Sequence, residues 1–118
     1  MKEKIDKWLI EHVLEYEWIN HMGAWYPTEK QLGRERRLSD SSFPHEWHPT
    51  EDIAQAFMCV DNLIEKGFNA RLHNNKYLKE PWVFAVLDNN YNKITEANSI
   101  ERCMAICLAM YKATGGPL

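Results

Sequence analysis

The sequence predicts an α+β protein in which a helix and a long irregular segment are followed by a helix, a three-stranded antiparallel meander and a last helix. Three observations carry this prediction. Apolar residues recur at three- and four-residue steps in three segments, which indicates amphipathic helices. Between residues 68 and 96 the period changes to two, and turn-forming residues separate the short runs. Because hairpin-length links join these runs, we expect an antiparallel sheet rather than a doubly wound α/β fold.

The first predicted helix covers residues 1–18 of what we expect to be a single domain of 118 residues. His12 falls on the apolar stripe of this helix and is expected to be a hydrogen-bonded core histidine. Residues 20–49 are predicted to form an irregular loop rich in aromatic, Ser, Pro and His residues. Loops of that length inside a compact domain are uncommon and are often functional.

The second predicted helix begins the core unit, residues 50–114. Thr50 is the expected N-cap, and Gly67 is expected to end the helix after Glu65 or Lys66. Strands are predicted over residues 68–73, 82–87 and 93–96, followed by a last helix with Asn98 as its cap and Glu101 as the capping-box partner. The side chains expected among the most buried are Ile53, Phe57, Val60, Phe84, Val86, Met104 and Leu108.

Charge and composition limit the classes of function. Fourteen Lys and Arg residues against seventeen Asp and Glu residues give a net charge of -3, which argues against a general binder of duplex nucleic acid. No apolar run approaches the roughly 20 residues of a membrane span, so we expect no membrane interaction and a cytoplasmic location. Three cysteines do not make a disulfide framework, and we expect buried free thiols.

Catalytic and metal-binding motifs find no support in the sequence. His45, His48 and Cys59 do not follow a zinc-ligand spacing, so no metal is predicted. The Ser, Asp and His residues between 39 and 45 have the residue types of a hydrolytic triad, but they lack a nucleophile elbow. No glycine-rich phosphate loop is present either. We therefore expect no enzyme activity and no cofactor.

The candidate binding site is the one net-positive segment of the chain together with the aromatic residues before it. Trp25 and Tyr26 have rings that stack on a base, and Arg34, Arg36 and Arg37 have guanidinium groups that bind phosphate. The alternative is structural: the tryptophans wrap the loop onto the core and the arginines are solvated.

Two stretches of the chain resemble the phage ABA sandwich domain family. Residues 43–60 contain a proline and aromatic residues, then a cap and an alanine-containing helix. Residues 97–110 are similar to the closing helix of the family through their Ala-Ile-Cys-Leu-Ala core, and the strand at 82–84 falls in matching order. The basic residues 34–37 depart from the family pattern. The resemblance implies a fold and a phage or prophage origin, but it supplies no catalytic residues.

The function expected first is a non-catalytic phage or prophage accessory protein that binds a host protein. The first alternative is a sponge that sequesters a nucleotide-type signalling molecule of host defence. The second is a weak module like a double-stranded RNA-binding domain, because residues 50–114 share its order of elements. The apolar residues of the last helix, from Cys107 to Tyr111, cover more than one face, so we also expect a homo-oligomer.

Overall fold

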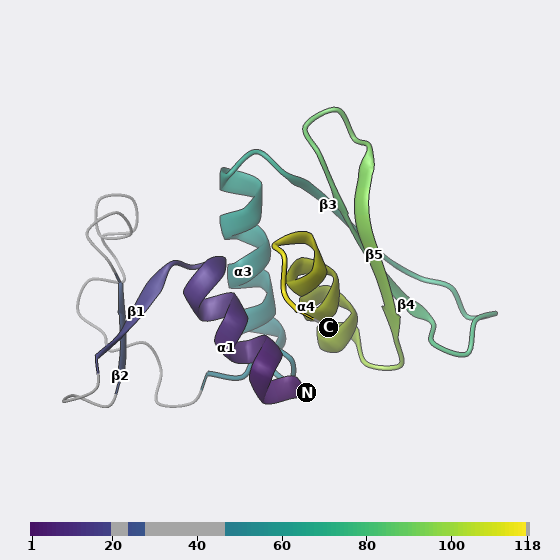
Figure 1. Ribbon diagram of the computed structural model, residues 1–118. Coiled ribbons are helices and arrows are strands. Elements are labelled where there is room, and N and C mark those ends of the chain that lie inside the picture. The colour runs from purple at the N-terminus through teal and green to yellow at the C-terminus, as the bar shows by residue number, and fades with distance from the viewer. Residues whose placement is uncertain (20–23, 28–46, 118) are drawn as a thin grey trace.

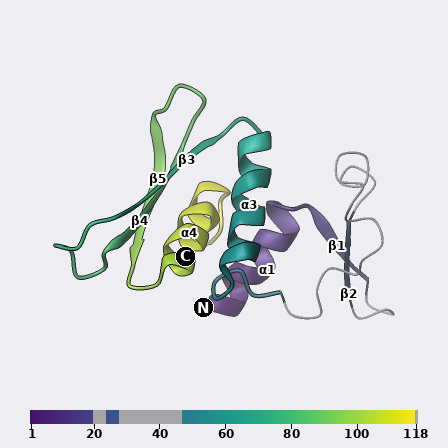
Figure 2. The same cartoon turned by 180° about the vertical axis from the view of Figure 1, so that it is seen from behind.

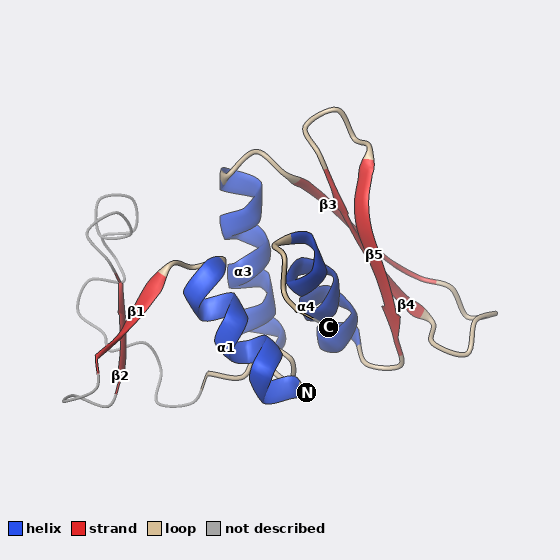
Figure 3. Cartoon of the chain, viewed as in Figure 1, coloured by secondary structure: helices blue, strands red, loops and turns tan. Residues whose placement is uncertain are grey.

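A computed structural model describes residues 1–19, 24–27 and 47–117 (Figure 1). The α+β fold is confirmed, with the predicted order of helix, long connection, helix, meander and helix (Figure 3). The elements are α1 (Lys2–His12), β1 (Tyr16–Ile19), β2 (Ala24–Pro27), α3 (Ile53–Glu65), β3 (Asn69–Asn74), β4 (Trp82–Leu87), β5 (Lys93–Ser99) and α4 (Arg102–Ala113).

Helix α4 is the centre of the fold. It lies between the three-stranded sheet on one side and helices α1 and α3 on the other (Figure 1 and Figure 2). The sheet is antiparallel in the order β3-β4-β5, and the side chains of Phe84 and Val86 join the buried core under α4. The predicted strand at 82–87 is confirmed to the residue. It is the middle strand of the sheet, and its continuous apolar run is buried.

The first helix is shorter than the predicted range of 1–18, because it ends at His12 and Tyr16 begins a strand. Glu15 has a φ of 62°, a left-handed conformation that turns the chain out of the helix. Lys66 stabilises this change of direction, since its Nζ donates to the carbonyl oxygen of Val13 at 2.8 Å and lies 3.4 Å from Glu15 Oε1. The resulting β1-β2 hairpin replaces the first part of the expected irregular loop.

His12 does not occupy the core position that its spacing predicts. Its side chain is 46% exposed, and its ring stacks on Trp8 with the ring centres 3.7 Å apart. The Nε1–H group of Trp8 donates to the hydroxyl of Thr114 at 2.9 Å, so Trp8 joins α1 to the end of α4. The buried side of α1 is formed by Ile5, Asp6, Leu9 and Ile10.

Helix α3 begins at a different cap and turns a different face to the core. Asp52, rather than Thr50, is the N-cap, and its carboxylate accepts from the backbone N–H of Gln55 at 3.1 Å. The end at Glu65 is confirmed, with Gly67 following at a φ of 99°. Phe57, which was expected in the core, is 39% exposed, because Ala56, Cys59, Val60 and Leu63 supply the buried side of the helix.

Helix α4 is buried on several sides within one chain. Asn98 is not its cap, because β5 continues to Ser99 and Glu101 occupies the N-cap position. Met104 and Leu108, expected among the most buried residues, are only half-buried and pack against the core cluster. Apolar residues on several sides of α4 were the reason to expect a homo-oligomer. Within one chain, the sheet and helices α1 and α3 already cover these sides.

The chain beyond α4 folds back onto that helix. A Cβ atom on Gly116 would lie 2.5 Å from ring carbons of Tyr111, so only glycine fits this close approach. The hydroxyl of Tyr111 donates to the carbonyl oxygen of Pro117. Among the residues that the structure describes, no helix is long and apolar enough to cross a membrane.

Candidate functional site

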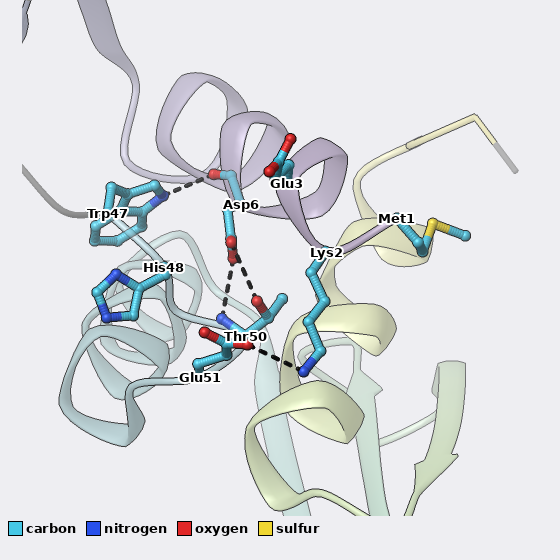
Figure 4. A pocket seen from close by; sticks show the side chains of 8 residues that line it. All are labelled: Met1, Lys2, Glu3, Asp6, Trp47, His48, Thr50 and Glu51. Carbon is cyan, nitrogen blue, oxygen red and sulfur yellow. Dashed lines mark hydrogen bonds and ion pairs between the residues drawn. The ribbon is translucent and has the colours of Figure 1, made fainter.

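Helices α1, α3 and α4 begin at the same end of the molecule, and an open hollow of about 820 Å³ lies there (Figure 1 and Figure 4). Its walls come from the first turns of α1 and from the segment that leads into α3. The lining residues are Met1, Lys2, Glu3, Asp6, Trp47, His48, Thr50 and Glu51. The hollow therefore gathers acidic, basic and aromatic groups.

Asp6 is the buried acid of the hollow, with 7% of its surface exposed. Thr50 donates to both carboxylate oxygens, through its backbone N–H to Oδ1 at 3.0 Å and through its hydroxyl to Oδ2 at 3.1 Å. Burial raises the pKa of Asp6, although the Thr50 hydrogen bonds and the nearby His48 oppose the rise. The Nε1–H of Trp47 donates to the backbone carbonyl of Asp6 at 2.7 Å.

Lys2 links the beginnings of the three helices. Its Nζ lies 3.3 Å from Glu51 Oε1, just before α3, and 3.1 Å from Glu101 Oε1, at the N-cap of α4. Hydrogen bonds to Glu101 and then to Glu51 raise the pKa of Lys2, so the ammonium group stays charged. Lys2 and Asp6 are one helical turn apart, and each ties α1 to a neighbouring segment.

The polar groups of the hollow connect α1 to the segment before α3 and to the start of α4. Both oxygens of Asp6 accept hydrogen bonds from Thr50, and the charge of Lys2 is balanced by two glutamates. The backbone N–H of His48 donates to Gln55 Oε1 at 2.8 Å, which fixes the turn before α3. Within residues 1–19, 24–27 and 47–117, no group of three or more His, Cys, Asp or Glu side chains is arranged to hold a metal ion.

The three thiols lie in and beside the core. Cys59 and Cys107 are buried and Cys103 is half-buried, and all three are free, as the sequence predicts. Desolvation raises the pKa of each thiol. A thiol with a raised pKa is a poor nucleophile, because only the thiolate attacks.

The residues of the predicted binding site are only partly placed by the structure. Trp25 and Tyr26 are consecutive residues of β2, at register positions opposite Trp18 and Glu17 of β1. Arg34, Arg36 and Arg37, like His45, lie outside the described residues. The hairpin that holds Trp25 and Tyr26 lies at the other end of the molecule from the three-stranded sheet (Figure 1 and Figure 2).

A second candidate surface is the exposed side of α3, which includes Phe57, a residue expected in the core. Phe57 is 39% exposed and Ile64 is 49% exposed, and Ile53 at the start of the helix is half-buried. Steps of four and seven residues place these three side chains on one side of the helix. We call Ile53, Phe57 and Ile64 the α3 stripe.

Sequence reasoning missed the hollow, although it contains a readable signal. Asp6 lies three and four residues before Leu9 and Ile10, so helical spacing places its carboxylate on the buried side of α1. A buried carboxylate requires hydrogen-bond donors, and Thr50 supplies two. The identity of the donor depends on how the two helices pack, which local patterns do not contain.

Comparison with known proteins finds no matching family model, no matching curated protein and no matching solved structure. The resemblance to the phage ABA sandwich family stays a prediction made from residues 43–60 and 97–110.

Proposed function

We propose that the protein is a non-catalytic binding protein that docks another protein through the α3 stripe, in the manner expected of a phage or prophage accessory protein that engages a host protein. The observation that supports this proposal is the exposure of Phe57 and Ile64. A single exposed apolar residue is common on a protein surface, but three aligned on one helix form a patch that a partner can cover.

The geometry of the α3 stripe fits helix recognition by an apolar groove. Partners of this kind bind side chains that recur at three-, four- and seven-residue steps on one helix face. Phe57 provides the central aromatic anchor, and aromatic residues dominate the binding energy of many interfaces. The stripe borders the buried Val60, so the helix face that a partner would touch is held in place by the core.

The charges of α3 define the rim of this surface. Between Ile53 and Glu65 the helix contains two acidic residues, Asp61 and Glu65, and no Lys or Arg. Both acidic side chains are exposed. We expect the partner to combine an apolar groove with Lys or Arg residues at its edge, because complementary charge speeds association and selects the partner.

Site-specific photo-crosslinking tests the proposal. A photoreactive phenylalanine analogue at position 57 should crosslink to one protein in extracts of a bacterial host, and the introduced change Ile64→Asp should abolish that crosslink. The same analogue at position 100 is the matched control, because Ile100 is 71% exposed and lies outside the stripe. Equal crosslinking from positions 57 and 100, or no effect of Ile64→Asp, contradicts the proposal. Circular dichroism checks that each variant is folded.

A further inference from the structure

The connection between β3 and β4 forms a turn at its tip. The carbonyl oxygen of Asn75 accepts from the backbone N–H of Leu78 at 3.0 Å, and its side-chain oxygen accepts from the N–H of Tyr77 at 3.1 Å. These bonds define a β-turn in which Lys76 and Tyr77 occupy the two central positions. The N–H of Asn75 also donates to the carbonyl oxygen of Pro81 at 2.7 Å, which closes the loop. The turn therefore holds Lys76 and Tyr77 at the end of a hairpin that projects away from the helices (Figure 1 and Figure 2).

This tip exposes an aromatic ring beside basic side chains. Tyr77 is 86% exposed, and Nζ of Lys76 lies 5.4 Å from the centre of its ring. Lys79 follows two positions later and is also exposed. Leu78 is 42% exposed, so more than half of its surface is withdrawn from water. The tip thus presents positive charge and a flat ring rather than an aliphatic point.

The start of α4 adds a second cation at the same end of the sheet. The strand register pairs Trp82, which begins β4, with Ser99, which ends β5, and Arg102 begins α4 three positions later. Cζ of Arg102 lies 5.5 Å from the centre of the Trp82 ring. The side-chain N–H of Asn98 donates to the carbonyl oxygen of Glu80 at 3.4 Å and so joins the hairpin to β5. Two segments that are distant in the sequence therefore bring their cations to one end of the molecule.

The cations at this end are not neutralised by the fold. We call the group the hairpin-tip patch, and it consists of Lys76, Tyr77, Lys79 and Arg102. Among the residues that the structure describes, no carboxylate forms an ion pair with any of its three cations. The glutamate before Arg102 is paired with Lys2 instead. Glu80 is the one acidic residue in the sequence from 75 to 82, so the patch is net positive on a chain whose net charge is -3.

We propose that the hairpin-tip patch binds single-stranded nucleic acid. A base stacks on the open face of Tyr77, and the three cations contact the phosphates of neighbouring nucleotides. Because every base has a flat face and every nucleotide has a phosphate, a ring among cations recognises the strand without reading its sequence. The closed turn holds these groups in place before the ligand arrives, which lowers the ordering cost of binding.

The chemistry of the patch favours a single strand over other polyanions. The bases of a duplex are stacked on one another, so none offers a face to Tyr77 unless it is first removed from the stack. A membrane anchor buries apolar side chains below the headgroups. Here Leu78 is mostly withdrawn and Lys76 occupies the turn. With three phosphate contacts at about 0.7 each, the logarithm of the association constant should fall with the logarithm of the salt concentration with a slope of about -2.

Fluorescence anisotropy of labelled oligonucleotides of about 12 nucleotides tests the proposal, since single-strand sites have this size. The purified chain should bind oligo(dT) or oligo(U) more tightly than a duplex of equal length, and the tighter of the two tells DNA from RNA as the ligand. Lys79→Glu and Arg102→Glu should each lower the affinity roughly tenfold or more and flatten the salt slope. Tyr77→Ala should lower it roughly fivefold or more with the salt slope unchanged, because stacking is lost and no charge is removed.

The other hairpin of the sheet supplies the matched controls. Tyr91 is 72% exposed in the connection between β4 and β5, and Lys93 is exposed at the end of the sheet opposite to the patch. Tyr91→Ala and Lys93→Glu make the same chemical changes there and should leave the affinity unchanged. Ile64→Asp should also bind as the wild type does, which separates failure of this inference from failure of the α3 binding proposal.

Each outcome decides the proposal. Absence of binding at low salt overturns it, and so does tighter binding to the duplex. Binding that the three patch variants leave unchanged also overturns it, as does co-sedimentation with phosphatidylglycerol vesicles without binding to either oligonucleotide. The substituted side chains are exposed, so unfolding of the variants is not expected, and circular dichroism verifies this.

Discussion

Replacing Phe57 and Phe84 by alanine, one at a time, compares the same chemical change at two levels of burial. Phe84 is 1% exposed, and truncation of a buried phenylalanine costs about 3–5 kcal/mol of unfolding free energy. Phe57 is 39% exposed, so about three fifths of it is removed from water. Three fifths of the roughly 1.5–3 kcal/mol for complete burial is about 1–2 kcal/mol. Alanine is also the better helix former by about 0.5 kcal/mol, which leaves a net cost of about 0.5–1.5 kcal/mol for Phe57→Ala.

Urea unfolding followed by circular dichroism measures both costs, and equal slopes against urea would show that the two variants unfold to comparable states. We expect Phe84→Ala to be less stable than Phe57→Ala by about 1.5–4.5 kcal/mol, from the same values. Equal losses would refute the reasoning, because they would place Phe57 in the core. A phenylalanine that contributes little to folding and stays partly exposed is available to a partner.

The remaining predictions concern the hollow, the thiols and the basic segment. Burial raises the pKa of Asp6, so the folded chain holds its proton more tightly than the unfolded chain, and Asp6 weakens the fold as the pH rises from the ordinary value of 3.8 through the raised pKa. Asp6→Asn keeps a hydrogen-bond partner for Thr50 without the titrating group. Urea titrations should show its unfolding free energy, relative to that of the wild type, rising across that pH window and then staying constant. A difference in unfolding free energy that does not change with pH would contradict this. Iodoacetamide should modify Cys103 first in the native chain and all three thiols in urea, as counted by mass spectrometry. Charge reversal at Arg36 and Arg37 should abolish carry-over of a nucleotide-type ligand, seen as excess absorbance at 260 nm, and retained carry-over would eliminate that site.

The helices and strands of the core unit could be predicted because their signals are local. The apolar spacing of the second predicted helix and the apolar run of β4 each reside in a few consecutive residues, and the elements formed where these signals occur. Boundaries moved where a neighbouring element competed for the same residue. Asn98 pairs in β5 instead of capping α4, and Thr50 binds Asp6 instead of capping α3.

Burial was predicted less well, because a stripe of apolar residues does not say which part of it meets a neighbour. Phe57 fits the predicted stripe of α3 as well as Val60 does, yet only Val60 points fully into the core. Helix α4 shows the opposite case, since two layers cover it and its burial follows no single stripe. The sequence predicted a binding site at Trp25 and Tyr26, and the structure places both residues in a strand. The Asp6–Thr50 contact of the hollow was not predicted, because it depends on packing between residues 44 positions apart.

The shared starting end of α1, α3 and α4 has an electrostatic consequence. The peptide dipoles of a helix add up to about half a positive charge at its amino-terminal end, so three such ends and the ammonium of Lys2 concentrate positive charge in one place. Carboxylates stand where this charge is greatest: Glu51 and Asp52 before α3, and Glu101 before α4. Part of the acidic excess of the chain therefore offsets the repulsion between the positive ends of its aligned helices. Salt screens the repulsion between aligned dipoles and the attraction of these carboxylates together, so the two effects offset each other as ionic strength changes.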